Sequence, residues 1–258
     1  IMKSISIAIV TYNNASTIKE TLDSIRALSG ASYTYKVQVI DNGSTDHTRE
    51  IVREYSDIAE LILSPKGNVG FGAAHNVVIP TLRSDFHVIM NPDVTIKTTD
   101  FLEKLIRIFE QNPSVGMIAP SVRNENGELQ YLCRRDLTIL DLMLRFSPIK
   151  IMKRRRQYHE MRDMDYSQPF EVAFSSGCCM LIRTDIFVAI GGFDDRYFLY
   201  AEDADLCRSV RQKSQIQYRP ELEVCHRWAR ASYRNAGMTK IHIQSLLKYF
   251  KKWGWKFK

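Results

Sequence analysis

The chain has 258 residues, of which 45% are hydrophobic and 25% charged, and its 36 Lys and Arg exceed its 29 Asp and Glu to give a formal net charge of +7. This is the composition of an ordinary globular chain, so it excludes disorder as the default state. The five cysteines are odd in number and form no CxxC pair, which favours neither a disulfide framework nor a zinc site and fits a reducing compartment. The sequence shows no signal-peptide pattern and no apolar run of the roughly 18 residues needed to cross a bilayer. We therefore expect a cytoplasmic protein, with Ile1 a remnant before the natural start at Met2.

Up to Pro120 the sequence alternates apolar, β-branched runs with amphipathic segments. The apolar runs predict five strands, at 4–10, 36–41, 60–64, 86–91 and 115–120. Helices are predicted after the first four strands, at 17–30, 45–55, 73–79 and 100–112. The first helix is expected to begin with a capping box of Thr17 and Glu20. This alternation predicts an α/β fold with a mostly parallel sheet covered by helices on both faces.

Beyond Pro120 this rhythm changes. Asn126 and Gly127 predict a hairpin turn, and a basic, weakly periodic stretch at about 134–169 is interpreted as an insertion. The stretch 171–183 predicts a pair of strands, followed by a short helix. A small antiparallel sheet is expected on the acceptor side. The last residues, 233–258, form a basic tail whose apolar residues have helical spacing. Such a tail suits either a helix on an anionic membrane surface or a helix packed on the domain.

Polar residues follow the predicted strands of the first half, at the sheet edge where open α/β proteins bind ligands. Asp41 ends the second strand and is suited to accept a hydrogen bond from a nucleotide base; alternatively, it belongs to a turn in which Ser44 or Thr45 caps the next helix. The glycine-rich stretch 67–72 lacks the order of the dinucleotide and P-loop motifs. It therefore indicates either diphosphate binding or only a tight turn.

Asp93 follows the fourth predicted strand, in the sequence NPDV. An unpaired carboxylate at the end of an apolar strand is costly, and hard cations such as Mg²⁺ and Mn²⁺ take oxygen ligands from carboxylates and substrate phosphates. Asp93 is therefore a candidate metal ligand. The alternative is an Asx-type turn after Pro92.

The stretch 195–210 gathers four carboxylates and three aromatic rings. Acidic residues are favoured in the first turn of a helix, and Leu206 and Val210 have helical spacing, so one interpretation is only a helix start. The other interpretation is that one of these carboxylates is a functional group. Composition and periodicity leave both open.

Six motifs, in order along residues 4–232, resemble the inverting glycosyltransferases of family 2, which have a GT-A fold. These motifs are TYNN, VIDNGSTDHT, NVGFGAAHN, NPDV, SSGCCMLIRTDIFVAIGGFDDRYFLYAEDADLCRSV and CHRWARAS. NPD and GGFD with YAEDADLCR are most similar to rhamnosyltransferases of bacterial surface-polysaccharide assembly. The resemblance implies one GT-A catalytic domain at 2–232, with a nucleotide-sugar half at 2–95 and an acceptor half at 96–232.

The resemblance also implies a role for each matching residue. Asp203 would be the general base that removes the proton of the acceptor hydroxyl, supported by Glu202. Asp93 would hold the Mg²⁺ or Mn²⁺ that bridges the donor phosphates, and His226 would contact that metal or the diphosphate. The residues expected to bind the donor are Thr11, Tyr12, Asn13, Asp41, Asn42, Ser44, Asn68, Gly70, Phe71, Gly72, Asn76 and Asn91. The residues expected to bind the acceptor are Gly177, Phe198 and Tyr200.

One position departs from the family pattern. Many members have an Asp-x-Asp pair where this chain has Asn91 and Asp93. An amide oxygen is a weaker metal ligand than a carboxylate. We therefore expect either a looser metal dependence or contact of Asn91 with the donor sugar.

By resemblance, dTDP-rhamnose is the preferred donor, and a UDP-hexose or UDP-N-acetylhexosamine is the alternative. The acceptor would be a glycan or a saccharide linked to a polyprenyl diphosphate, reached at the inner face of the cell membrane through the basic tail. The excess of basic residues leaves nucleic-acid binding as a distant alternative. That alternative gives Asp41, Asp93 and Asp203 no role, so we expect no nucleic-acid partner.

Overall fold

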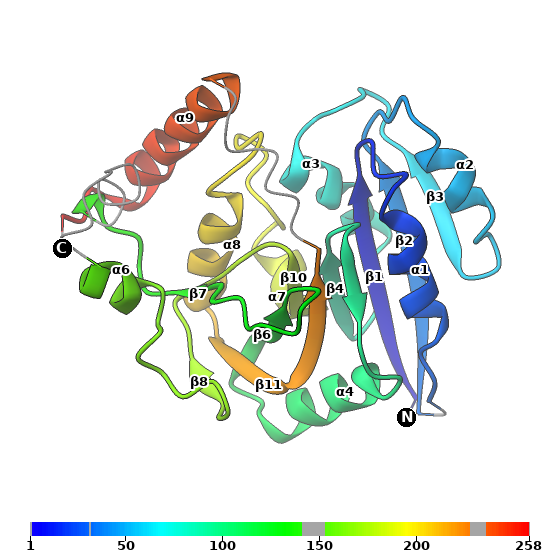
Figure 1. Ribbon diagram of the computed structural model, residues 1–258, viewed down its shortest axis with the longest axis horizontal. Coiled ribbons are helices and arrows are strands. Elements are labelled where there is room, and N and C mark those ends of the chain that lie inside the picture. The colour runs from blue at the N-terminus through cyan, green and yellow to red at the C-terminus, as the bar shows by residue number, and fades with distance from the viewer. Residues whose placement is uncertain (1, 31, 141–152, 228–235, 258) are drawn as a thin grey trace.

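The computed structural model describes residues 2–30, 32–140, 153–227 and 236–257 (Figure 1). Within these residues a nine-stranded sheet has the order β3-β2-β1-β4-β10-β6-β11-β5, with β8 paired to β11. Its strands are β1 (Lys3–Thr11), β2 (Tyr33–Asp41), β3 (Ala59–Leu63), β4 (Phe86–Met90), β5 (Val94–Ile96), β6 (Val115–Arg123), β8 (Phe170–Glu171), β10 (Cys179–Arg183) and β11 (Gln215–His226). A second, antiparallel sheet consists of β7 (Cys133–Arg134) and β9 (Phe174–Ser175).

The large sheet is parallel in its first half and mixed in its second. β1 pairs in parallel with both β2 and β4, and β2 with β3. β10 then runs antiparallel between β4 and β6, while β6 is parallel to β11. Because of this reversal, the residues just before β10 lie at the carboxyl end of β4. The predicted α/β fold with a small antiparallel sheet is confirmed, and both predicted halves of the chain contribute to one sheet.

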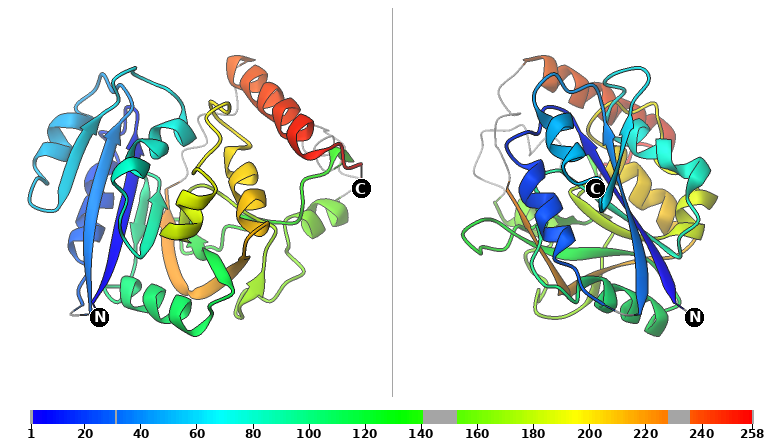
Figure 2. Two further views of the ribbon diagram at one scale, coloured as in Figure 1. Left: turned by 180° about the vertical axis from the view of Figure 1, so that it is seen from behind. Right: turned by 90° about the vertical axis from the view of Figure 1, so that its right-hand side faces the viewer.

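Helices cover both faces of the sheet (Figure 2). Alternate residues of β1 point to opposite faces, so Ile7 packs with Leu22 on one face and Ala8 packs with Ala74 on the other. The helices are α1 (Ile18–Arg26), α2 (Thr48–Arg53), α3 (Phe71–His75), the 3₁₀ segment η1 (Asn76–Thr81), α4 (Phe101–Gln111), α6 (Lys153–His159), α7 (Thr184–Ala189), α8 (Glu202–Arg211) and α9 (Ala236–Trp253).

The second predicted helix is shorter than expected. It begins at Thr48 rather than at 45, because Asp46 Oδ1 accepts hydrogen bonds from the Thr48 backbone N–H (3.1 Å) and from Thr48 Oγ1 (2.5 Å). These bonds hold the residues before Thr48 in a loop. The predicted cap at Ser44 or Thr45 is therefore wrong.

The capping box predicted for the first helix is also wrong. Thr17 Oγ1 donates to the carbonyl oxygen of Asn14 (3.4 Å) and caps no helix N–H. The helix ends at Arg26 instead of at Gly30. The helix predicted at 73–79 is a short α-helix that continues as a 3₁₀ segment.

The turn predicted at Asn126 and Gly127 is confirmed. Gly127 has φ of +79°, and an isolated antiparallel bridge joins Arg123 to Leu129. The predicted basic insertion contains α6, and its residues 141–152 lie outside the described part of the chain. No helix among the described residues is long and apolar enough to span a membrane.

The C-terminal tail contains α9, which lies beside α8 at the opposite end of the molecule from α2 (Figures 1 and 2). Leu246, Tyr249 and Phe250 of α9 form a buried cluster with Tyr197 and Ala201. Of the two interpretations of the tail, packing on the domain is therefore observed for this face of the helix.

Asp205 fastens α9 to α8 through its buried carboxylate. Asp205 Oδ1 accepts a hydrogen bond from Trp253 Nε1 (2.6 Å) and Asp205 Oδ2 pairs with Lys252 Nζ (2.7 Å). The hydroxyl of Tyr197 also donates to Asp205 Oδ1 (3.2 Å). Three groups, two from α9 and one from the segment before α8, thus meet at one buried charge.

Candidate active site

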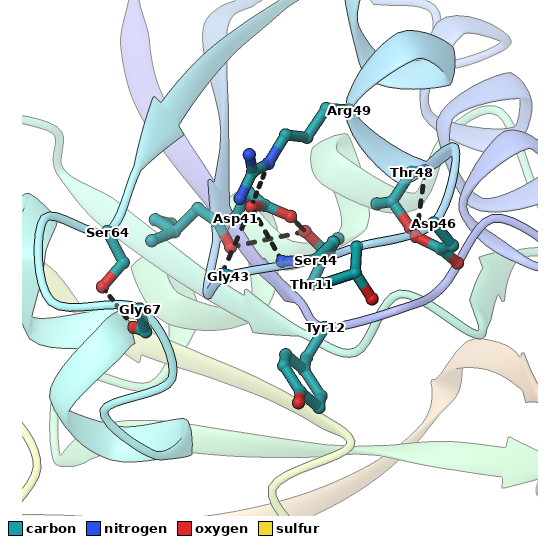
Figure 3. Close-up of polar contacts among 12 residues, drawn as sticks. Thr11, Tyr12, Asp41, Gly43, Ser44, Asp46, Thr48, Arg49, Ser64 and Gly67 are labelled. Atoms are coloured by element: carbon teal, nitrogen blue, oxygen red, sulfur yellow. Dashed lines mark hydrogen bonds and ion pairs between the residues drawn. The ribbon is translucent and has the colours of Figure 1, made fainter.

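The carboxyl ends of β1 and β2 form one wall of the site, because their parallel register places Thr11 beside Asp41. The buried carboxylate of Asp41 accepts hydrogen bonds at Oδ2 from Arg49 Nε (2.6 Å) and from the backbone N–H groups of Ser44 (3.1 Å) and Gly43 (3.3 Å) (Figure 3). Thr11 Oγ1 donates to Asp41 Oδ1 (3.3 Å).

These partners keep Asp41 ionised. Burial raises the pKa of Asp41, but the hydrogen bonds from Ser44 and the ion pair with Arg49 outweigh burial and hold this pKa below its usual value. The Asp41 side chain has no exposed surface, whereas that of Arg49 is 34% exposed. Asp41 therefore organises the wall, and its predicted contact with a base stays a prediction.

The loop after β1 is tied to the loop after β2. The Asn13 backbone N–H donates to Ser44 Oγ (2.9 Å), and Asn13 Oδ1 accepts from the Thr45 backbone N–H (2.8 Å). Asn13 itself has φ of +58°. Tyr12 is 49% exposed on this wall (Figure 3). Its ring is therefore available to stack on a nucleotide base.

The loop 67–72 is fastened to the same wall by Asn42. Asn42 Nδ2 donates to Asn68 Oδ1 (3.1 Å), and Asn42 Oδ1 accepts from the backbone N–H of Val69 (3.1 Å). Both amides predicted to bind the donor thus hold the glycine-rich loop in place.

Gly70 carries this loop across to the acceptor half. It has φ of +93°, and a Cβ atom there would lie 2.2 Å from the carbonyl oxygen of Phe198. The backbone N–H of Phe71 donates to that same oxygen (3.1 Å). The tight-turn interpretation of Gly70 is therefore confirmed, and its predicted donor contact remains a prediction.

Gly72 and Asn76 fasten α3 to the segment before α8. A Cβ atom at Gly72 would lie 2.7 Å from Phe193 Cβ. Asn76 Nδ2 donates to the Phe193 carbonyl (2.7 Å), and Asn76 Oδ1 accepts from the Phe193 N–H (2.9 Å). The Asn76 amide is thus engaged with the main chain, and its predicted role in donor binding stays a prediction.

Asp93 and His226 are brought together by the pairing of β5 with β11, in which Val94 lies opposite His226. His226 Nε2 lies 3.4 Å from Asp93 Oδ1, and the two side chains are 10% and 20% exposed. Asp93 Oδ1 and His226 Nδ1 are buried, and neither has a hydrogen-bond partner within the described residues. A buried carboxylate oxygen without a partner is costly, so the pair fits a bound cation.

The donor set suits a divalent ion that is shared with a substrate. Carboxylate oxygen is a preferred ligand of Mg²⁺ and Mn²⁺, and imidazole nitrogen is a ligand of transition metals. Asp93 and His226 supply one carboxylate and one imidazole, and a divalent ion held by this pair would keep positions for phosphate oxygens and water. No cluster of three or more His, Cys, Asp or Glu gathers in the described ranges. Asp93 also lines a cleft of about 560 Å³ together with Lys97 and Arg227. Arg227 pairs with Glu20 (3.2 Å) and Glu125 (3.1 Å), so Lys97 is the cation of this cleft suited to a diphosphate.

Asp203 lies close to this end of β4. The backbone N–H of Asn91 donates to the Cys178 carbonyl (2.8 Å), and the backbone N–H of Gly177 donates to Asp203 Oδ2 (3.2 Å). Burial raises the pKa of the Cys178 thiol to about 12, and the negative charges of Asp93 and Asp203 act in the same direction. The candidate metal ligand and the candidate base therefore both lie near one buried thiol.

The first turn of α8 holds two adjacent acids of unequal character. Glu202 is 5% exposed, and its pKa is raised by burial and by the charge of Asp203. Asp203 accepts hydrogen bonds from Gly177 N–H and from the Ala204 N–H (2.9 Å) at the positive end of the helix. Burial and the neighbouring charge therefore favour the neutral form of Glu202, while Asp203 has two N–H donors placed to stabilise a carboxylate.

The backbone before these acids is strained. Tyr200 and Ala201 have φ of +69° and +64°, a left-handed conformation that residues other than glycine adopt at a cost. The strain is held by the surrounding packing, because Ala201 is buried in the cluster with α9. It sets the direction in which α8 begins and therefore where Asp203 points.

Of the predicted acceptor-binding residues, Gly177 lies against Asp203. A Cβ atom at Gly177 would lie 3.4 Å from Asp203 Cβ, and Phe198 is 39% exposed. Tyr200 stacks on His242 of α9, with ring centroids 4.4 Å apart. A cleft of about 620 Å³, lined by Asp203, extends between α8 and α9.

Comparison with known proteins assigns the family. The description "Glycosyl transferase family 2" matches residues 6–191. The chain belongs to this family. This glycosyltransferase is 28% identical over 214 residues to the N-acetylglucosaminyl-diphospho-decaprenol L-rhamnosyltransferase of Mycobacterium tuberculosis, a match that covers 77% of this chain and 68% of the relative. It is 26% identical over 258 residues to rhamnosyltransferase WbbL of Escherichia coli K12. This match covers 94% of this chain and 91% of the relative.

Solved structures show the same fold. The mannosyltransferase PcManGT of Pyrobaculum calidifontis, in complex with GDP-Man and Mn²⁺, has a TM-score of 0.67 at 18% identity and covers 98% of this chain. Residues 1–349 of S. aureus TarS, in complex with UDP-GlcNAc, have a TM-score of 0.62 at 16% identity and cover 96% of it. The glycosyltransferase spans 64% and 66% of these two chains. At such identities the likeness shows the GT-A fold alone.

Three neighbours of the predicted site residues were missed from the sequence. They are Arg49, which pairs with Asp41; His242, which stacks on Tyr200; and Arg208, which lines the cleft with Asp203. The first and third belong to helices whose basic residues look like ordinary solvated charge. The second belongs to the tail, whose docking on α8 no local pattern reveals.

Proposed function

We propose that this glycosyltransferase transfers L-rhamnose from dTDP-rhamnose to a saccharide linked to a polyprenyl diphosphate, with inversion, in the synthesis of a bacterial cell-surface glycan. The observation that carries the proposal is the position of Asp203 near the end of β4. Asp203 accepts a hydrogen bond from the Gly177 N–H, and the carbonyl of the next residue, Cys178, accepts one from the Asn91 N–H. A carboxylate beside one end of a diphosphate-binding region is the arrangement that in-line displacement of a diphosphate needs.

The reaction follows from these groups. The acceptor hydroxyl oxygen attacks the anomeric carbon while Asp203 takes up the hydroxyl proton, which contributes about 10²- to 10⁴-fold to the rate. The bond from the anomeric carbon to the diphosphate oxygen breaks on the opposite face, and its electron pair leaves with the nucleoside diphosphate. Asp93 and His226 would hold a divalent cation, which supplies electrostatic stabilisation of the charge developing on the leaving diphosphate. Attack from the face opposite the leaving group inverts the anomeric centre.

The names of the relatives support rhamnose as the transferred sugar, since two of them are rhamnosyltransferases. A UDP-hexose or UDP-N-acetylhexosamine is the second candidate, because a chain of the same fold binds UDP-GlcNAc. Membership of family 2 leaves nucleic-acid binding without support.

Thermal-shift measurements with dTDP-rhamnose, UDP-glucose and UDP-GlcNAc, each with Mn²⁺, Mg²⁺ or EDTA, test the donor and the metal. A donor present at about 100 times its Kd stabilises the folded state by roughly 2.7 kcal/mol. A shift for dTDP-rhamnose that EDTA weakens, and that is smaller in Asp93→Asn, is expected. A thermal shift with a UDP-sugar alone would mean that the donor is a UDP-sugar, the second candidate. The absence of a shift with any of the donors would contradict the proposal.

We further propose that α9 brings the enzyme to the cytosolic face of an anionic membrane. The face of α9 turned away from α8 exposes Ile243 and Leu247, and Trp255 and Phe257 beyond the helix are 55% and 70% exposed. Apolar side chains interleaved with lysines suit the headgroup region of a bilayer.

Vesicle sedimentation tests this contact with an Ile243→Glu and Leu247→Glu double variant. Deleting the tail is a poorer test because Lys252 and Trp253 hold Asp205. Binding to vesicles with anionic lipid is expected to fall in the double variant and to persist in Val188→Glu, a control at an exposed apolar residue of α7. Unchanged binding by the double variant would contradict the membrane proposal.

A further inference from the structure

The cleft of about 620 Å³ is formed by α8, by α9 and by the segments around β7 and β9. Figures 1 and 2 show α9 lying along α8 on this side of the molecule. Asp203 lines the cleft from the first turn of α8, and His242, Leu246 and Tyr249 line it from α9. The cleft therefore begins at the candidate base and extends away from the end of β4.

The lining of this cleft carries an excess of positive charge. Four arginines line it, against two aspartates. Two of the arginines have carboxylate partners, since Arg135 pairs with Asp163 and Arg211 with Asp136. The other two are Arg134 and Arg208. Arg134 donates to the carbonyl oxygens of Tyr131 and Cys133, and its charge helps to lower the pKa of Glu160.

Arg208 is held in place by uncharged groups. Its guanidinium donates to the Tyr249 hydroxyl (3.4 Å) and to the Trp253 carbonyl (3.3 Å), and it lies 4.9 Å from the centroid of the Trp253 ring. Within the described part of the chain, no carboxylate forms an ion pair with it. A guanidinium is always charged and its planar fork matches phosphate oxygens, so a half-buried arginine oriented without a counter-ion suits an anionic ligand.

The apolar part of the lining restricts the kind of anion. Leu246, Leu137 and Ala204 line the same cleft, and Leu247 lies exposed on the far face of the helix that carries Leu246. A ligand with an anionic group for Arg208 and an apolar chain for α9 would match both the charged and the apolar lining of the cleft. A free sugar has neither an anionic group nor an apolar chain.

We propose that this cleft binds the diphosphate of the acceptor, with Arg208 as its main ligand, while the acceptor sugar extends to Asp203. This inference rests on the proposed function for the identity of the acceptor. It gives the enzyme two anion sites on different sides of Asp203: the donor diphosphate near Asp93, and the acceptor diphosphate near Arg208. The carrier chain would then leave along α9.

Calorimetric titration with inorganic pyrophosphate in EDTA tests the anion site without relying on catalysis. Wild type, Asp93→Asn and Arg107→Gln are expected to bind alike, since Arg107 is an exposed arginine on α4, outside the cleft. Arg208→Gln is expected to lose about 10- to 100-fold in affinity, the usual range for hydrogen bonds to a charged group. Equal affinity in Arg208→Gln would overturn the proposal, as would loss of binding in Asp93→Asn alone.

Kinetics with two acceptors then test the assignment to the acceptor. A saccharide linked to a farnesyl diphosphate and the octyl glycoside of the same saccharide are compared at saturating dTDP-rhamnose. Arg208→Gln is expected to raise the KM for the diphosphate-linked acceptor about tenfold or more, with kcat and the KM for the octyl glycoside unchanged. A proportional loss on both acceptors would overturn the inference, because Arg208 would then act through Asp203 or through the fold.

Two further measurements separate this inference from other failures. Arg208→Lys keeps the charge and loses the fork, so an intermediate KM is expected, with a thermal midpoint close to wild type. A thermal shift of Arg208→Gln with the donor reports on the proposed function alone. If wild type binds no donor and the pyrophosphate titration still depends on Arg208, the proposed function fails while the anion site stands.

Discussion

The donor side and the acceptor side of this site are built in different ways. On the donor side, each polar group at the ends of β1 and β2 is engaged by a neighbour: Asp41 by Thr11 and Arg49, and Asn42 by Asn68. On the acceptor side, Glu202 Oε2 is buried with no hydrogen-bond partner in the described ranges. The wall formed by the ends of β1 and β2 thus has its hydrogen bonds in place before any nucleotide arrives, whereas Asp93 Oδ1 at the candidate metal site has no hydrogen-bond partner in the described ranges.

The difference indicates where binding energy is used. A wall whose hydrogen bonds are already formed costs no reorganisation when a nucleotide sugar binds. On the acceptor side, a buried acid, a strained turn and an arginine with no carboxylate partner among the described residues are unfavourable features that a bound acceptor would relieve. Substitutions on the donor side should therefore change folding stability, whereas those on the acceptor side should change turnover.

The largest effect is expected for Asp203→Asn. An amide cannot take up the acceptor proton, so kcat should fall about 10²- to 10⁴-fold. The thermal shift with the donor should be retained, because Asp203 lies beyond Gly177 from the end of β4. Initial rates with a diphosphate-linked acceptor measure the first quantity, and turnover within a few-fold of wild type would rule Asp203 out as the base.

The same substitution on the donor side, Asp41→Asn, should destabilise the fold. It leaves Arg49 without its charged partner, at a cost of about 2 kcal/mol in the free energy of unfolding. This cost is smaller than that of breaking a fully buried ion pair, because the Arg49 side chain is one-third exposed. Urea unfolding at pH 7 measures this loss.

The effect of Asp41→Asn should depend on pH. The pKa of Asp41 is lower in the folded state than in the unfolded chain, so its contribution is complete above about pH 4 and is lost as the pH falls further. The difference in the free energy of unfolding between wild type and Asp41→Asn should therefore become smaller as the pH falls below about 4. A variant as stable as wild type at pH 7 would show that the donor wall is not held by this charge.

The sequence predicted the framework well because strands and their ends obey local patterns. Apolar β-branched runs located β1, β2 and β4, and the rule that ligands bind at carboxyl ends of strands singled out Asp41 and Asp93. The order of motifs then supplied Asp203 and His226. Long-range contacts could not be predicted from local patterns. The reversal of β10 brings Gly177 to Asp203, which is 26 positions further along the chain.

Helix ends and the tail were the least predictable parts. The first turn of α1 was misassigned because the Thr17 hydroxyl is used by the Asn14 carbonyl instead of by the helix. The docking of α9 depends on Asp205 and Trp253, which are 48 residues apart and individually resemble a capping acid and a membrane-facing aromatic. The first feature is decided by a local hydrogen bond in the loop before α1, and the second by tertiary packing, which can outweigh local propensity.

Beneath both sides, two buried histidines should make the fold sensitive to acid. Burial lowers the pKa of His75 and of His87 to about 3, and no nitrogen of either ring has a hydrogen-bond partner within the described residues. The unfolded chain takes up these protons below about pH 6.5, so stability falls between pH 6.5 and pH 3, by about 2 kcal/mol per histidine at pH 5.

His87→Leu should remove about half of this loss. His87 stacks on Phe187 with ring centroids 5.0 Å apart, and a leucine keeps an apolar contact there without a titrating group. Urea unfolding at pH 7 and pH 5 measures the slope, and His47→Leu, at an exposed histidine, is the control that should leave it unchanged. An unaltered slope in His87→Leu would mean that the ring is already protonated or solvated in the folded state.

The smallest effect on turnover is expected for Glu202→Gln, although Glu202 is adjacent to Asp203, where the largest effect is expected. Burial and the charge of Asp203 raise the pKa of Glu202 and so favour its neutral form, and glutamine is a neutral group of the same shape. The rate should stay within about tenfold of wild type, equivalent to less than about 1.4 kcal/mol of barrier. Comparing initial rates of Glu202→Gln and Asp203→Asn at one pH separates the two acids.

Stability gives Glu202→Gln a second, independent outcome. The folded-state pKa of Glu202 lies above its unfolded value, so the folded chain binds the extra proton, and wild-type stability is greatest below about pH 4.3 and declines as the pH rises toward the folded pKa. Glutamine does not titrate, so the stability of the variant relative to wild type should increase as the pH rises through this range. If Glu202→Gln instead abolished turnover while Asp203→Asn retained it, the base would be Glu202, and the acceptor side would be organised around the buried acid.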